Sequence, residues 1–144
     1  MARRDPHSYN DDTQVATAVL ALTARIDFAS RILHGDATLT FHQPGAGTLD
    51  LDTRDLAIDA VEDGGGQPLP FTLHPSEPVL GARLAIELRP GTAAVRIRYR
   101  TAPTASALQW LEPAQTAGGV QPFLFSQSQA IHARSMIPLQ DTPR

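Results

Sequence analysis

Two glutamines, a histidine and an arginine stand within eight residues near the end of the chain, in the stretch FLFSQSQAIHARSMIPLQDTP. Gln127 and Gln129 stand two positions apart, and His132 and Arg134 follow them. A carboxamide has two N–H donors and one acceptor oxygen but no charge, so a glutamine pair can hold both a carbonyl and an amine. If residues 125–131 are extended, both carboxamides project from one side of the chain. This stretch is the first candidate for a binding site; the alternative is that both amides only tie a loop to neighbouring backbone.

No residue pattern in this chain predicts catalysis or a metal site of its own. The five histidines never stand four apart, so the H-E-x-x-H spacing of a zinc-binding helix is absent. Cysteine is also absent, which excludes a thiolate nucleophile and a cysteine-based zinc site. The acidic cluster Asp50, Asp52 and Asp55 lacks the glycine and terminal glutamate of a calcium-binding EF-hand loop. A histidine with no catalytic partner in the pattern, such as His132, is more often a hydrogen-bonded structural residue than a catalyst.

Length and charge narrow the class of protein. A chain of 144 residues is the size of one ordinary domain, and its net charge of −3 argues against a nucleic-acid partner. The apolar run at residues 15–22 is much shorter than the roughly 20 residues of a membrane span and lacks the flanks of an export signal. We therefore expect a cytoplasmic protein with no membrane partner. Residues 1–14 are expected to form a polar, flexible leader and residues 15–144 the domain.

Apolar and polar residues alternate along much of the chain, which predicts strands. Alternation at residues 16–28 and 33–41 indicates a hairpin, and shorter runs at 49–52, 56–58 and around Phe71 indicate further strands. No segment of ten or more residues has convincing helical periodicity. The fold class predicted from these patterns is all-β.

The clearest alternation covers residues 83–89 and 95–100, and the sequence Pro-Gly-Thr at 90–92 predicts a turn between two paired strands. One face of this pair is apolar and the other charged, as in an antiparallel sheet with one side in water. Arg96, Arg98 and Arg100 share the charged face, and we interpret them as a solvated surface rather than a binding site.

Three motifs resemble the N-terminal domain of the peptidase M1 zinc aminopeptidases, in the branch that includes leukotriene A(4) hydrolase and its bacterial relatives. They are SALQWL at 106–111, FLFSQSQAIHAR at 123–134 and PLQDTP at 138–143, in that order. The resemblance runs from about Val15 to the last residue. It implies a saddle-like, mostly antiparallel β domain or sandwich that packs against a separate catalytic domain. In that family the catalytic domain carries the zinc. Further strands follow QDTP in that family, so the chain is expected to be truncated at its C-terminal end, to hold no cofactor and to be inactive alone.

The resemblance also implies roles for residues of the candidate stretch. Gln127 and Gln129 would line the substrate groove, Gln129 would contact the N-terminal end of a peptide, and Ala130 would offer its backbone. The residues expected to act as scaffold are His132, Arg134, Pro138, Asp141 and Pro143, with a charge-assisted link between Arg134 and Asp141. The function expected is a non-catalytic, groove-lining domain of a zinc-dependent aminopeptidase. The alternative is a free-standing β-sandwich that serves as a binding or interaction module.

Overall fold

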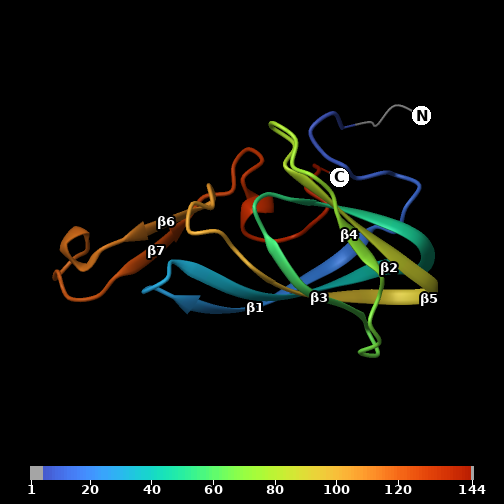
Figure 1. The fold of residues 1–144 in the computed structure, drawn as a ribbon, viewed down its shortest axis with the longest axis horizontal. Coiled ribbons are helices and arrows are strands. Elements are labelled where there is room, and N and C mark those ends of the chain that lie inside the picture. Colours follow the sequence, from blue (N-terminus) through green and yellow to red (C-terminus); the bar gives the residue numbers. More distant parts are fainter. Residues whose placement is uncertain (1–4, 144) are drawn as a thin grey trace.

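The computed structural model describes residues 5–143, and its strands form one five-stranded antiparallel sheet and a separate two-stranded hairpin (Figure 1). The strands of the large sheet are β1 (Thr17–Asp27), β2 (Ile32–Thr53), β3 (Ala57–Asp63), β4 (Phe71–Leu73) and β5 (Ala82–Arg100). The hairpin consists of β6 (Leu108–Leu111) and β7 (Phe123–Ser126), and two 3₁₀ turns are η1 (Pro113–Gln115) and η2 (Ala133–Ser135). Over residues 5–143, no helix is long and apolar enough to cross a membrane. The predicted all-β class is confirmed.

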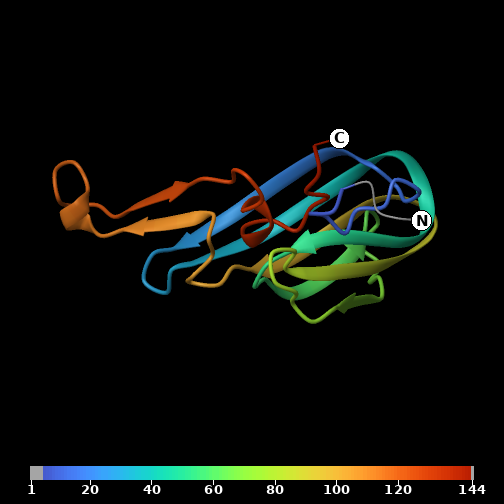
Figure 2. The ribbon, with the colours of Figure 1, turned by 90° about the horizontal axis from the view of Figure 1, so that it is seen from above.

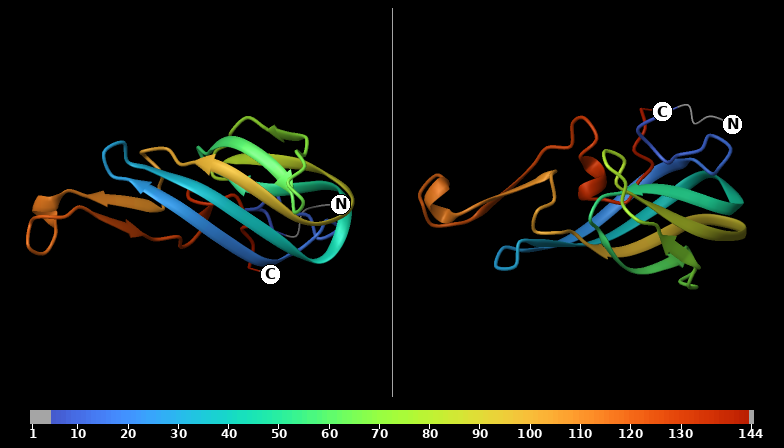
Figure 3. Two further views of the ribbon diagram at one scale, coloured as in Figure 1. Left: turned by 90° about the horizontal axis from the view of Figure 1, so that it is seen from below. Right: turned by 45° about the horizontal axis from the view of Figure 1, so that its top comes forward.

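Strands β2 and β5 pair along most of their length and bend at the same place (Figures 2 and 3). At the bend, Gly45 pairs with Thr92 and Gly47 pairs with Leu88, with shifts of register on both sides. Gly47 and Gly91 have φ angles of 82° and 83°, a region of backbone space that favours glycine. Strands β1 and β3 flank one half of the bent pair, and β4 pairs with the other half of β5. The bend thus turns one sheet into two facing layers.

The turn predicted at residues 90–92 is wrong. The runs at 83–89 and 95–100 belong to the single strand β5, and each pairs with a different half of β2 rather than with the other run. Likewise, the runs at 33–41 and 49–52 belong to the single strand β2. Proline and glycine indicate a change of direction, but the same residues serve a hairpin turn and a bend inside a long strand.

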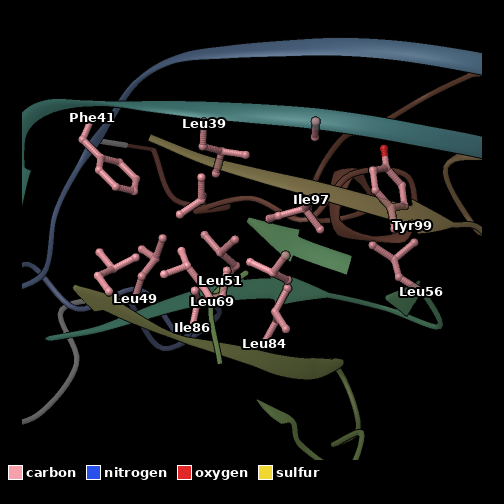
Figure 4. Close-up of a cluster of buried hydrophobic side chains, with 14 of the residues drawn as sticks. Leu39, Phe41, Leu49, Leu51, Leu56, Leu69, Leu84, Ile86, Ile97 and Tyr99 are labelled. Carbon is pink, nitrogen blue, oxygen red and sulfur yellow. The ribbon is translucent and has the colours of Figure 1, made fainter. Parts of the chain in front are cut away.

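Apolar side chains from the two layers meet in the core (Figure 4). Leu39 and Ile97 come from one half of the β2–β5 pair, and Leu51, Leu84 and Ile86 come from the other half. All five are 0% exposed. Full burial of each such side chain contributes about 1.5–3 kcal/mol. The alternation read from the sequence correctly identifies the buried face of both long strands.

The arginine stripe of β5 lies in solvent, as predicted. Each guanidinium group pairs with a carboxylate of a neighbouring strand, and each arginine side chain is about half exposed. The pairs are Arg96 with Asp36, Arg98 with Glu62 and Arg100 with Asp59. Each carboxylate thus neutralises an arginine within the sheet itself, which supports the interpretation of a solvated surface.

The hydroxyl of Tyr99 lies in the core without a hydrogen-bond partner in the described part of the chain. The residue is 1% exposed, and burial raises the pKa of Tyr99 above its ordinary value of 10.0. The folded state therefore holds this proton more tightly than the unfolded state, and the free energy of unfolding falls as the pH rises above 10.0. We expect Tyr99→Phe to equal or exceed the unsubstituted chain in stability, by up to about 1 kcal/mol at pH 7. Its advantage should grow in urea unfolding at a pH of about 11.

Tyr9→Phe is the matched control for this prediction. The hydroxyl of Tyr9 is also buried, but it donates to the carbonyl oxygen of Gly81 at 3.0 Å. Removing it should therefore destabilise the chain by about 1 kcal/mol. Equal losses in the two variants would contradict the view that the Tyr99 hydroxyl is unpaired.

Candidate functional site

The candidate site is the loop of residues 127–132, which follows the projecting β6–β7 hairpin (Figure 1). The Gln127 N–H donates to the carbonyl oxygen of Ala107 at 2.9 Å, which extends the strand pairing by one residue. The chain then turns, and the His132 N–H donates to the carbonyl oxygen of Ser128 at 2.9 Å. The extended conformation considered for residues 125–131 therefore ends early. Strand β6 begins at residue 108, so beyond the hydrogen bond between Gln127 and Ala107 the chain after β7 has no strand to pair with.

The three sequence-predicted site residues, Gln127, Gln129 and Ala130, all lie exposed in this loop. The Oε1 atom of Gln127 accepts a hydrogen bond from the Gln129 N–H at 3.1 Å, so one amide does tie the loop to its own backbone. Within residues 5–143, neither the Nε2 group of Gln127 nor the carboxamide of Gln129 makes a hydrogen bond to the rest of the chain. The loop therefore presents a complete carboxamide and two further N–H donors to solvent.

Buried Arg134 anchors the loop on its C-terminal side, within η2. Its side chain is 0% exposed, and its Nε donates to Oδ2 of Asp141 at 3.0 Å. The predicted link between Arg134 and Asp141 is thus confirmed. The other two nitrogens donate to backbone carbonyl oxygens, Nη1 to Leu80 at 2.8 Å and Nη2 to His7 at 2.7 Å. One guanidinium group therefore joins three segments that lie far apart in the sequence.

Asp52 is a second buried charged residue, next to Arg134, and its burial was not predicted from the sequence. Its carboxylate is 0% exposed and lies 3.7 Å from Nη1 of Arg134. It accepts hydrogen bonds from the Ser8 hydroxyl, the Tyr9 N–H and the Asp141 N–H. Burial raises the pKa of Asp52, and these donors, together with the charge of Arg134, oppose that rise. The alternation with Leu51 predicts a solvated position, but the N-terminal segment covers it.

The N-terminal segment takes part in the packing of the domain. Ser8 is 0% exposed and Tyr9 is 7% exposed, although both fall in the range expected to form a flexible leader. Residues 1–4 of that range lie outside the described residues. The boundary placed at residue 15 stays a prediction. Tyr9 is the only phenylalanine, tyrosine or tryptophan among residues 5–14, and this large aromatic side chain is the signal that could have indicated a buried anchor.

His132 is hydrogen-bonded, as predicted: its Nδ1 lies 2.7 Å from the hydroxyl oxygen of Ser106. A hollow of about 520 Å³ lies beside the loop and is lined by residues 5–7, 130–131 and 141–143. Among residues 5–143, no group of three or more histidine, cysteine, aspartate or glutamate side chains is placed to hold a metal ion. The side chains of this loop suit hydrogen bonding to a polar ligand rather than metal chemistry.

Comparison with known proteins gives consistent matches. The family model described as the peptidase M1 N-terminal domain matches residues 5–144. Leukotriene A-4 hydrolase of Xenopus laevis is 39% identical over 146 residues, covering 96% of this chain and 24% of that protein. Leucine aminopeptidase 2 of Yarrowia lipolytica is 35% identical over 144 residues, covering 97% of this chain and 22% of that protein.

A solved structure supports the same assignment. The structure of yeast LTA4 hydrolase in complex with bestatin superimposes with a TM-score of 0.88 and 31% sequence identity, covering 98% of this chain and 23% of that chain. This chain thus spans about a quarter of the length of the relatives it matches. The match to the family model covers all of the described residues. The chain belongs to the peptidase M1 N-terminal domain family.

Proposed function

We propose that this domain lines the substrate groove of a zinc-dependent aminopeptidase and holds the N-terminal end of a peptide. Gln129 makes the main contact, Gln127 adds N–H donors, and Ala130 offers its backbone. The observation that carries the proposal is the exposed carboxamide of Gln129, which has no intramolecular hydrogen bond within residues 5–143 and stands on a loop fixed at both ends. The name of one relative, leucine aminopeptidase 2, supports the substrate class.

The chemistry of an amide suits this role. The oxygen of a carboxamide accepts a hydrogen bond from an ammonium group, and its N–H groups donate to a peptide carbonyl. Because the group is neutral, it orients the substrate without a competing charge near the reacting bond. Holding a substrate in a productive geometry can supply a large share of rate enhancement. The described residues of this chain do not fit a zinc ion, so the metal and its ligands belong, in this proposal, to the catalytic domain.

Gln129→Ala in the enzyme that contains this domain tests the proposal. A hydrogen bond to a charged group contributes about 1.5–3 kcal/mol, so we expect kcat/KM for aminoacyl-nitroanilide substrates to fall about 10- to 100-fold. The melting temperature should not change, because the exposed carboxamide makes no hydrogen bond within residues 5–143. Steady-state kinetics and thermal unfolding measure the two effects separately.

Gln109→Ala is the matched control, since Gln109 is an exposed glutamine of β6 outside the loop. We expect its kinetics to equal those of the unsubstituted enzyme. Unchanged kcat/KM in Gln129→Ala, with unchanged melting temperature, would remove Gln129 from the site.

A further inference from the structure

Residues 5–9, which we call the N-terminal strap, are hydrogen-bonded to the two buried charged residues Arg134 and Asp52. The carbonyl oxygen of His7 accepts from Nη2 of Arg134 at 2.7 Å. The Ser8 hydroxyl and the Tyr9 N–H both donate to the carboxylate of Asp52. Three consecutive strap residues thus bind groups that belong to β2 and η2. Arg134, which anchors the loop, therefore also binds the strap.

Asp52 can join the strap to the C-terminal segment because its carboxylate accepts hydrogen bonds from both, and Oδ2 accepts from the Ser8 hydroxyl as well as from Asp141. Oδ1 accepts from the Tyr9 N–H at 2.7 Å, and Oδ2 accepts from the Asp141 N–H at 2.9 Å. An ionised carboxylate accepts at both oxygens, whereas an amide of the same shape accepts at only one. An asparagine at this position would leave one of the two backbone donors facing an NH₂ group.

The strap and the candidate loop both line one hollow, the hollow of about 520 Å³ already described. Pro6 and His7 of the strap line it, as do Ala130 and Ile131 of the loop. Arg134 follows the loop closely in sequence, and its guanidinium group binds the strap directly. A shift of the strap or of Arg134 is therefore expected to move both the strap residues and the loop residues that line the hollow.

We propose that Asp52 is a positioning residue for the candidate loop: it fixes the N-terminal strap against Arg134 and thereby sets the position of the loop that carries Gln129 and of Ala130, which lines the hollow. The role in peptide binding rests on the proposed function, whereas the coupling between strap and loop does not. Asp52 itself touches no substrate and acts only through the strap and Arg134.

Hydrogen–deuterium exchange of the whole chain tests the coupling. In Asp52→Asn we expect the hydrogen-bonded amides of Gln127, Gln129 and His132 to lose protection about tenfold or more. Amides in the centres of β2 and β5 should keep their protection. Loss of protection throughout the chain would mean that Asp52 holds the fold as a whole, and that result would overturn the proposal. Unchanged protection in the loop would also overturn it.

Asp50→Asn is the matched control. Asp50 is a buried carboxylate of the same strand, but it accepts from Nε2 of Gln14 at 3.0 Å and lies 3.5 Å from Arg83. We expect loop protection to be unchanged in this variant. If Asp52→Asn fails to fold, Ser8→Ala removes the hydroxyl that donates to Asp52 and accepts from the Asn10 N–H, and should lower protection in the same loop about threefold. An unaffected loop in Ser8→Ala would then count against the coupling.

Kinetics separate this proposal from the proposed function. In the enzyme that contains this domain, Asp52→Asn should raise KM for a peptide about tenfold while kcat changes less, because the groups that hold the substrate are displaced. If exchange in the loop rises but KM is unchanged, the coupling is supported and the peptide-binding role of the loop is contradicted. If both are unchanged, the coupling fails.

Discussion

Arg134→Met is expected to lower the free energy of unfolding by about 3–5 kcal/mol, because it removes the cation that lies beside the buried carboxylate of Asp52 and the partly buried carboxylate of Asp141. The arginine side chain is 0% exposed, and the carboxylates of Asp52 and Asp141 both lie within 4.0 Å of its nitrogens. Methionine also leaves the carbonyl oxygens of His7 and Leu80 without their donors. A domain of this size has a total stability of about 5–15 kcal/mol, so the variant should be only marginally folded.

Urea unfolding followed by circular dichroism measures this loss, and Arg98→Met serves as the control. Arg98 pairs with Glu62 on the solvated face and is half exposed, so its replacement should change the urea midpoint little. Adding Asp52→Asn and Asp141→Asn to Arg134→Met should recover part of the lost stability, because no uncompensated buried charge then remains. A midpoint for Arg134→Met equal to that of Arg98→Met would show that the buried guanidinium group does not hold these segments.

The sequence predicts the strands of this domain well, because alternation depends on a local period that solvent exposure imposes. Leu39, Leu51 and Ile97 all point into the core as expected. The connections between strands are harder to predict. The sequence Pro-Gly-Thr at 90–92 satisfies the requirements of a hairpin turn, yet the long pairing with β2 keeps β5 continuous through it. The pairing of strands is a property of the whole sheet, and local residue types do not determine it.

The candidate site could be predicted only in part. The residue pattern indicates Gln127 and Gln129, and the family resemblance adds the link between Arg134 and Asp141; all four residues lie within one short stretch of the sequence. Asp52 lies far from that stretch in the sequence, and it alternates with Leu51 as a solvated residue would. Its burial depends on the N-terminal segment, where Ser8 and Tyr9 donate hydrogen bonds to the Asp52 carboxylate. A contact between segments so distant in the sequence leaves no periodic signal.

Gly35→Ala is expected to destabilise the domain by about 3 kcal/mol, the upper end of the cost of an overfilled core. A Cβ atom at this position would lie 2.2 Å from Cζ of Tyr99 and 2.5 Å from its hydroxyl oxygen. The ring cannot move aside, because Tyr99 is 1% exposed and packs within the core cluster. Backbone preference alone would give the opposite sign, since alanine in a strand is favoured over glycine by about 0.5–1 kcal/mol.

A double-mutant cycle with Tyr99 separates the steric clash in Gly35→Ala from other causes. Tyr99→Leu shortens the side chain across the strand pair, so adding Gly35→Ala to it should cost little further stability. Tyr99→Phe should not relieve the clash, because Cζ remains within 2.2 Å of the new methyl group. Gly64→Ala is the control, since its Cβ would meet only the Cβ of Ala94, at an ordinary 3.6 Å. If Gly35→Ala loses the same stability with leucine as with tyrosine at position 99, the clash with the ring is not the cause.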